Sequence, residues 1–113
     1  MGSLRDRRCL PCDGLTERLD PARAEVLRSE LHPSWSVNKE ASELFREFEF
    51  GDFHQTMAFV NAVAYIAHAE DHHPDLHVGW GHCIVRYTTH AIDGLSENDF
   101  ICAALIDALP SLA

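Results

Sequence analysis

The chain has 113 residues, a formal net charge of −9 and a single lysine, Lys39. A chain of this length forms one domain around one hydrophobic core. The arginines are scattered, which argues against a nucleic-acid-binding protein, because such proteins gather basic side chains into a patch. No apolar run reaches the roughly 20 residues of a membrane-spanning helix. The charged segment 4–8 precedes no apolar signal-peptide core, so we expect a cytoplasmic protein.

The four cysteines do not form the pattern of a disulfide framework or of a zinc ribbon. Only Cys9 and Cys12 are close in sequence, whereas a zinc ribbon needs a second close pair. Disulfide frameworks are typical of small secreted domains that lack a sufficient core. We expect the other two cysteines, Cys83 and Cys102, to be small buried core residues.

Residues 1–18 lack any periodicity and are predicted to form an irregular arm before a single domain at 19–113. A first helix is expected after Asp20, which is a favourable N-cap residue, with Pro21 at the first helical position. His32 precedes a proline and should end this helix. Its apolar stripe comprises Ala24, Leu27 and Leu31.

Two strands and a long helix are predicted next. Aromatic enrichment favours strands at 35–37 and 44–50. Asp52 followed by Gln55 resembles a capping box and should begin a helix over about 53–71. Pro74 disfavours helical angles in the residue before it, so this helix must end near position 72.

The last third of the chain predicts a hairpin and a helix. Alternating apolar residues indicate strands at 76–80 and 83–89, joined by a turn at Gly81 and His82. Ser96 and Asp99 form a capping box for a helix that runs through Leu109. The predicted order is α-β-β-α-β-β-α. The fold class is therefore α+β, a four-stranded antiparallel sheet with its helices packed on one face.

Four of the eight histidines are candidates for a catalytic cluster. His68 and His72 are four residues apart in the last turn of the long helix, His73 follows at the break, and His90 lies beyond the final strand. Histidine titrates near neutral pH, so such a cluster can hold one protonated and one neutral ring, which suits acid/base catalysis. The helix dipole favours the protonated form of His72 by about 0.3–1 kcal/mol.

A helical zinc hydrolase is the alternative that this histidine spacing raises. Such enzymes use H-E-x-x-H or H-x-x-E-H, in which the glutamate lies at the second or fourth place. Here Ala69 and Asp71 occupy those places, so the motif does not match and no metal ligands are predicted. The remaining histidines near these elements, His54, His77 and His82, are expected to be ordinary surface residues.

These spacings resemble those of a known family. His72-His73-Pro74, then Trp80, His90 and Asp99 at intervals of five, nine and eight residues resemble the signature of the pterin-4a-carbinolamine dehydratases. Thr89-His90 with the segment 94–99 (GLSEND) is similar to the family's T-H…G-L-[TS]-x-x-D. The segment 48–53 (FEFGDF) is similar to its F-x-F-x-D-F junction, and the segment 9–12 (CLPC) to arms of bacterial members.

The resemblance implies a fold and a reaction. The family fold has the same element order that the periodicities predict. The implied activity is the loss of water from 4a-hydroxytetrahydrobiopterin to give quinonoid dihydropterin, without a metal or redox cofactor. In that reading His72 and His90 are the acid/base pair and His73 holds the pterin ring. The remaining residues would line the pocket or orient His90; they are Pro74, Thr89, Ala91, Asp99 and His68.

One position departs from the family pattern. An acidic residue usually stands four places before His72, where this chain has His68. A second histidine would oppose a protonated His72 by charge repulsion, so we expect an altered pH profile. His68 is therefore included among the candidate site residues.

The resemblance also leaves a second function open. Relatives of this fold act as a dimerisation cofactor of a transcription factor or as assembly factors of a carbon-fixing enzyme, and a third option is action on another pterin. Retention of all three histidines favours the enzyme, functionally linked to an aromatic amino-acid hydroxylase. The resemblance and the open sheet edges predict a homodimer or homotetramer.

Overall fold

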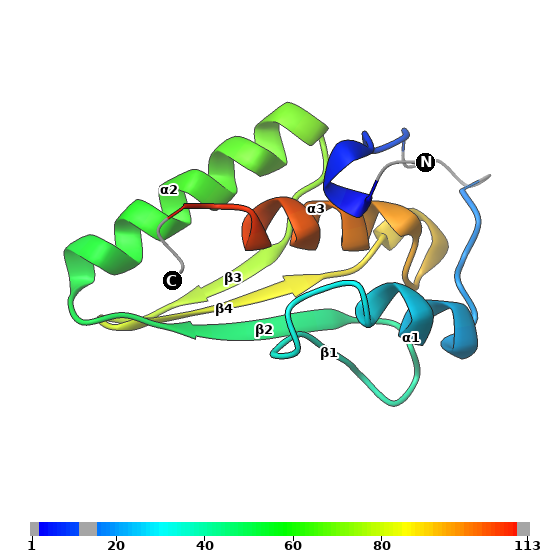
Figure 1. Ribbon diagram of the computed structural model, residues 1–113, viewed down its shortest axis with the longest axis horizontal. Coiled ribbons are helices and arrows are strands. Elements are labelled where there is room, and N and C mark those ends of the chain that lie inside the picture. The colour runs from blue at the N-terminus through cyan, green and yellow to red at the C-terminus, as the bar shows by residue number, and fades with distance from the viewer. Residues whose placement is uncertain (1–2, 12–15, 111–113) are drawn as a thin grey trace.

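The computed structural model describes residues 3–11 and 16–110 of the chain (Figure 1). The predicted order α-β-β-α-β-β-α is confirmed, with two added turns of 3-10 helix, η1 and η2. The elements are η1 (Leu4–Asp6), α1 (Pro21–Arg28), β1 (Ser36–Val37), β2 (Leu44–Glu49), α2 (Phe53–Glu70), β3 (Asp75–Val78), β4 (His82–Tyr87), η2 (His90–Ile92) and α3 (Glu97–Asp107).

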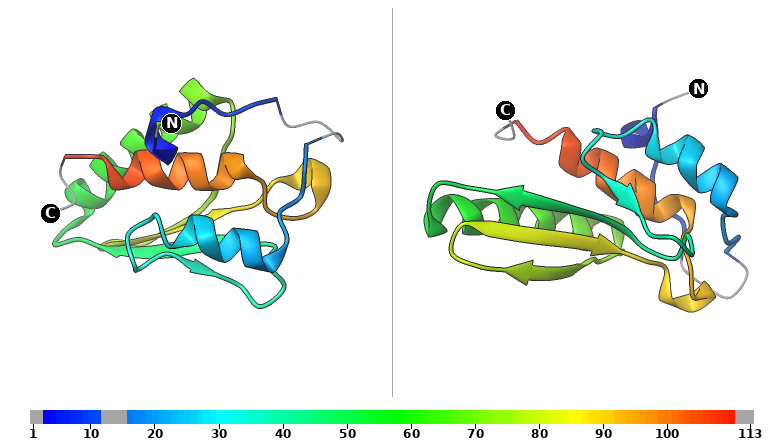
Figure 2. Two further views of the ribbon diagram at one scale, coloured as in Figure 1. Left: turned by 45° about the vertical axis from the view of Figure 1, so that its right-hand side comes forward. Right: turned by 90° about the horizontal axis from the view of Figure 1, so that it is seen from below.

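The four strands form one antiparallel sheet in the order β1-β2-β4-β3. The helices α2 and α3 lie across one face of this sheet, as predicted, and α1 packs at the β1 edge against β1 and α3 (Figures 1 and 2). The face that turns away from α2 and α3 is called the open face below. It carries the alternate residues of each strand, and in β4 these are His82, Ile84 and Arg86.

The predicted helix starts are confirmed by their caps. The Asp52 carboxylate accepts a hydrogen bond from the Gln55 amide at 2.8 Å, and both halves of the Ser96–Asp99 capping box are present. At its other end α2 stops at Asp71, whose φ of 52° is left-handed. This single turn in the backbone directs the next two residues, His72 and His73, off the helix axis.

Four predicted boundaries were wrong by a few residues. The helix α1 ends at Arg28 rather than at His32, and α3 ends at Asp107 rather than at Leu109. The strand β3 ends at Val78 because the turn before β4 begins at residue 79 and includes the exposed Trp80. The strand β4 ends at Tyr87, so that Thr89 lies beyond it in an isolated bridge to Gly94.

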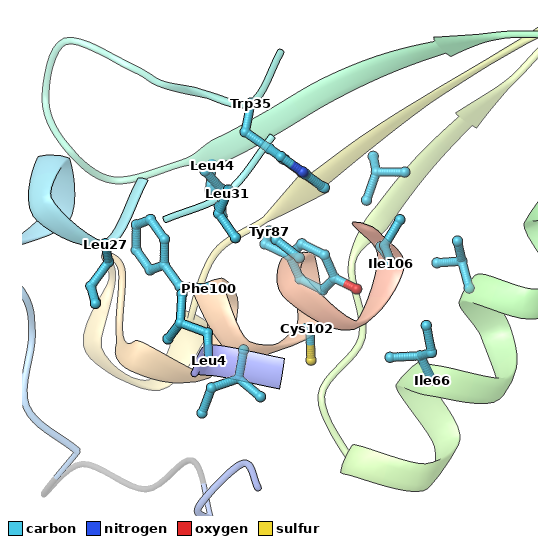
Figure 3. Close-up of a cluster of buried hydrophobic side chains, with 14 of the residues drawn as sticks. Leu4, Leu27, Leu31, Trp35, Leu44, Ile66, Tyr87, Phe100, Cys102 and Ile106 are labelled. Atoms are coloured by element: carbon cyan, nitrogen blue, oxygen red, sulfur yellow. The ribbon is translucent and has the colours of Figure 1, made fainter. Parts of the chain in front are cut away.

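The core lies between the helices and the covered face of the sheet (Figure 3). Cys83 and Cys102 are fully buried there, as predicted. Leu4 is also buried in the core, although it belongs to the arm that was predicted to be irregular. The largest fully buried side chains are Trp35, Tyr87, Phe100, Leu4, Leu27, Leu44, Leu95 and Ile106.

Residues 3–11 of the arm are fastened to α2 and α3 by side chains of both helices. The Cys9 amide donates to the Glu70 carboxylate at 2.9 Å, and Arg8 forms an ion pair with the same group at 2.9 Å. The Asn98 side chain exchanges two hydrogen bonds with the backbone of Leu10, at 3.0 and 2.7 Å. This part of the arm therefore runs along the end of α2 that carries His68, His72 and His73, and along the start of α3.

Candidate functional site

The structure brings His73 and His90 together from two elements that are distant in sequence. His73 follows the left-handed end of α2, and His90 begins η2, three residues after the end of β4. Their ring centroids are 6.5 Å apart with an interplanar angle of 33°. Both side chains are exposed, so a planar ligand could reach both rings from solvent.

His72 lies next to this pair but is buried, with 6% of its side chain exposed. Its Nε2 is 2.6 Å from Oδ1 of Asp99, which is fully buried. A carboxylate on one ring nitrogen fixes the orientation of an imidazole and stabilises its protonated form. The two residues therefore form a buried histidine–carboxylate pair behind the exposed rings.

Asp99 is itself held by residues on either side of η2, Thr89 before it and Ser96 after it. Its Oδ2 accepts hydrogen bonds from the Thr89 hydroxyl at 2.9 Å and from the Ser96 amide at 3.0 Å. The hydroxyls of Thr89 and Ser96 are 2.7 Å apart. The cap of α3 thus positions the carboxylate that binds His72, and one residue serves both purposes.

The predicted role of Asp99 in orienting His90 stays a prediction, because the hydrogen bonds of Asp99 go to other residues. Asp99 points its oxygens at His72, Thr89 and Ser96, because its place in the first turn of α3 directs it into the interior. The buried network around it was not predicted, although the Ser96–Asp99 capping box contained the signal for it.

Aromatic and sulfur groups complete the surroundings of His72. The Tyr87 ring stacks on it at 5.9 Å with an interplanar angle of 7°. Burial raises the pKa of the Tyr87 hydroxyl well above its usual range, so this tyrosine stays neutral. The Cys102 thiol donates to the His72 carbonyl oxygen at 3.9 Å. His72 is thus held on its ring face, its ring edge and its backbone.

The other predicted site residues lie at different depths around this cluster. Thr89 is buried, Pro74 is half-buried and Ala91 is exposed beside His90. His68 is exposed on the last turn of α2. Within residues 3–11 and 16–110, no three histidine, cysteine or acidic side chains are grouped so that they could hold a metal ion.

Comparison with known proteins assigns the fold and these residues to a family. The model of a family described as "Pterin 4 alpha carbinolamine dehydratase" matches residues 17–109. The chain belongs to the pterin-4a-carbinolamine dehydratase family. The matched region contains all three histidines and the buried pair.

Close relatives support the same assignment. A protein of Nitrosomonas eutropha named "Putative pterin-4-alpha-carbinolamine dehydratase" is 53% identical over 106 residues, which cover 94% of this chain and 92% of that protein. A protein of Legionella pneumophila with the same name is 45% identical, with 94% of each chain covered. The likeness extends over almost the full length of both relatives.

Two solved structures of the dehydratase type resemble this chain. The first is a "transcriptional coactivator/pterin dehydratase" from Brucella melitensis, with a TM-score of 0.76, 26% identity, and 81% of this chain and 97% of that chain covered. The second is a "pterin dehydratase-like protein" identified as a "RuBisCO assembly factor in the alpha-carboxysome". Its TM-score is 0.61 at 28% identity, and the match covers 73% of this chain and 95% of that chain.

No helix among the described residues of this family member is both long enough and apolar enough to cross a membrane.

Proposed function

We propose that this chain is a pterin-4a-carbinolamine dehydratase that converts 4a-hydroxytetrahydrobiopterin to quinonoid dihydropterin in the cytoplasm. The N5 lone pair of the pterin expels the hydroxyl group at C4a. A general acid protonates that group so that it leaves as water, and a general base takes the proton from N5. The observation that carries this proposal is the contact between the exposed rings of His73 and His90, together with the buried His72–Asp99 pair that adjoins them.

The acid/base pair in this proposal is His72 and His90. Asp99 gives His72 what a proton-transferring histidine needs, a fixed ring and a negative charge beside the protonated form. His90 is exposed and approaches from a different element, so the two rings can act on different atoms of one substrate. With 6% of its side chain exposed, His72 would meet the substrate through an edge of the ring.

In the same proposal His73 holds the pterin ring. It is exposed and tilted by 33° from His90, which leaves an aromatic surface on which a flat heterocycle can stack. Pro74 and Ala91 adjoin the two exposed histidines in sequence and would contact the substrate at its margins. Thr89 would act on the substrate indirectly, since its hydroxyl is bonded to Asp99 and Ser96.

A homo-oligomer is part of this proposal. The sheet order leaves β1 and β3 as edge strands, and β3 is the longer of the two. Edge strands with unpaired backbone groups are commonly paired or covered in natural proteins. A second copy of the chain would meet this need at the β3 edge.

The proposal is tested by the decay of freshly generated 4a-carbinolamine, followed by absorbance with and without the purified chain. We expect the chain to accelerate dehydration over the spontaneous rate, with saturation in substrate. Equal decay in the presence and absence of the folded protein would contradict the proposal.

A second candidate is a non-catalytic assembly factor, and one observation favours it: the structural likeness to the RuBisCO assembly factor. This function predicts no turnover and stable co-purification with a protein partner. Affinity purification from the native host, combined with the decay assay, separates the two functions because only the enzyme accelerates decay in the absence of other proteins.

A further inference from the structure

Two cysteines from opposite ends of the chain meet directly behind the histidine cluster. Cys9 in the arm and Cys102 in α3 are 93 positions apart, and their sulfur atoms are 3.6 Å apart. Cys9 is half-buried, whereas Cys102 is fully buried. Cytosolic thiols that form disulfides are usually catalytic or redox-sensing. Two contacting thiols at this place are therefore candidates for redox chemistry as well as for packing.

We propose that Cys9 and Cys102 are an oxidisable dithiol that a low-molecular-weight disulfide converts to a disulfide bond between the arm and α3. The Cys9 thiolate attacks one sulfur of the oxidant and releases one small thiolate, which leaves a mixed disulfide. The Cys102 thiolate then attacks the Cys9 sulfur and releases the second small thiolate. Two protein thiols are oxidised and one small disulfide is reduced to two thiols.

The surroundings of the two sulfurs set the order of these steps. Cys9 is the one that an oxidant can reach, because Cys102 has no exposed surface. The hydrogen bond with Cys9 and burial both raise the pKa of the Cys102 thiol well above its usual range, which disfavours its thiolate. We therefore expect fast modification of Cys9 and slow closure of the bond.

The arm can make the movement that closure requires. The two sulfurs must approach from 3.6 Å to about 2.05 Å. Residues 7–10 are attached to the helices through side chains of Glu70, Glu97 and Asn98 rather than through a strand or helix ladder. A small shift of the arm therefore does not break regular secondary structure.

The same bond would act on the site that the proposed function uses. The Cys102 thiol donates to the His72 carbonyl, and the Cys9 amide donates to Glu70, which is two residues before His72. Oxidation removes the thiol proton and ties the arm covalently beneath the end of α2. The disulfide bond can form whether or not the chain is a dehydratase.

The test is a peptide map of the full chain after incubation with oxidised glutathione, alkylation and trypsin digestion without reductant. Cys9 and Cys12 share the tryptic peptide 9–18, Cys83 lies in 47–86, and Cys102 lies in 87–113. The expected product joins 9–18 to 87–113 and persists in the Cys12→Ser variant. Cys83 is a built-in control, because burial raises its pKa to about 11 and it should remain a free thiol.

Thermal unfolding supplies a second measurement. A link that closes most of the chain should raise the melting temperature of the oxidised protein by about 10 °C or more relative to the reduced protein. The Cys9→Ser and Cys102→Ala variants should show no such increase. A Cys9–Cys12 loop, a glutathione adduct on Cys9 alone, two thiols that stay reduced, or the same thermal shift in either variant would each overturn the inference.

Discussion

Two pairs of histidines lie at different places on this molecule, and their ring geometries are similar. His73 and His90 have centroids 6.5 Å apart and an angle of 33°, and His77 and His82 have centroids 5.6 Å apart and an angle of 22°. The first pair joins the end of α2 to the segment after β4. The second pair lies on β3 and β4, on the open face of the sheet.

The difference between the pairs is what lies behind them. Behind His73 and His90 is a buried layer in which His72, Asp99 and Thr89 are connected by short hydrogen bonds. The ring of His82 instead lies against Gly79, where a β-carbon would come within 2.2 Å of it. Two neighbouring imidazoles are therefore not by themselves a site, and the buried carboxylate distinguishes the first pair from the second.

The largest expected effect is the loss of activity when a histidine of the first cluster is removed. We expect His90→Ala and His72→Ala each to lower kcat for carbinolamine dehydration by about 10²- to 10⁴-fold, the usual contribution of a general acid or base. The measurement is the absorbance decay of freshly generated substrate. Because His72→Ala also leaves the buried Asp99 without this partner, its fold must be checked by circular dichroism.

The matched control for this experiment is the second pair. His77→Ala and His82→Ala remove rings in a similar arrangement that has no such buried layer behind it. Both variants should retain kcat within about twofold, because they lack an acid/base role. Equal losses in the two clusters would show that the comparison between them is mistaken.

A smaller effect is expected when only the charge of the buried carboxylate is removed. Asp99→Asn keeps the shape of the side chain but removes the negative charge beside the His72 ring, so kcat should fall by about tenfold or more. The KM should change less than kcat, because Asp99 is fully buried and a substrate that enters from solvent would not reach it.

Ser96→Ala provides the control for helix capping. It removes the other half of the α3 capping box but leaves the contact between Asp99 and His72 in place. Both variants should lower the free energy of unfolding, by about 1 kcal/mol in the case of Ser96→Ala. Only Asp99→Asn should strongly lower kcat, and an equal loss in Ser96→Ala would mean that capping alone explains the result.

The sequence predicted the elements better than the way in which the site is assembled. Caps at Asp20, Asp52 and Ser96 are local patterns with a direct physical reason, and all three are where the sequence placed them. The antiparallel pairing of the strands and the placement of the helices on one face followed from short connections and alternating apolar residues. The boundaries that were wrong are the C-terminal ends of α1, β3, β4 and α3.

The depth of each histidine was not readable from the sequence. His72 and His73 are adjacent in sequence, yet His72 is buried and His73 is exposed. Both follow the left-handed Asp71, where the chain leaves the direction of α2. The partner of Asp99 depended on how α2 and α3 pack, which is a long-range property. The arm was also beyond prediction, since its contacts with Glu70 and Asn98 lack periodicity.

The smallest expected effect concerns His68, which stands where the family usually has an acidic residue. The sequence alone predicts an altered pH profile, because a second histidine would repel a protonated His72. In the structure His68 is exposed, and the buried Asp99 already supplies a negative charge at 2.6 Å from the His72 ring. Charges at exposed positions are screened by solvent and salt, so their influence on a buried pair is small.

We therefore expect His68→Glu to change kcat/KM by less than about threefold and to leave the pH of maximal activity nearly unchanged, because exposed charge pairs contribute little. The pH–rate profiles of the variant and the wild type measured at low and high salt check this. A shift of a full pH unit that disappears at high salt would show that residue 68 acts on the cluster directly. The family's acidic residue would then supply a charge that Asp99 alone does not replace.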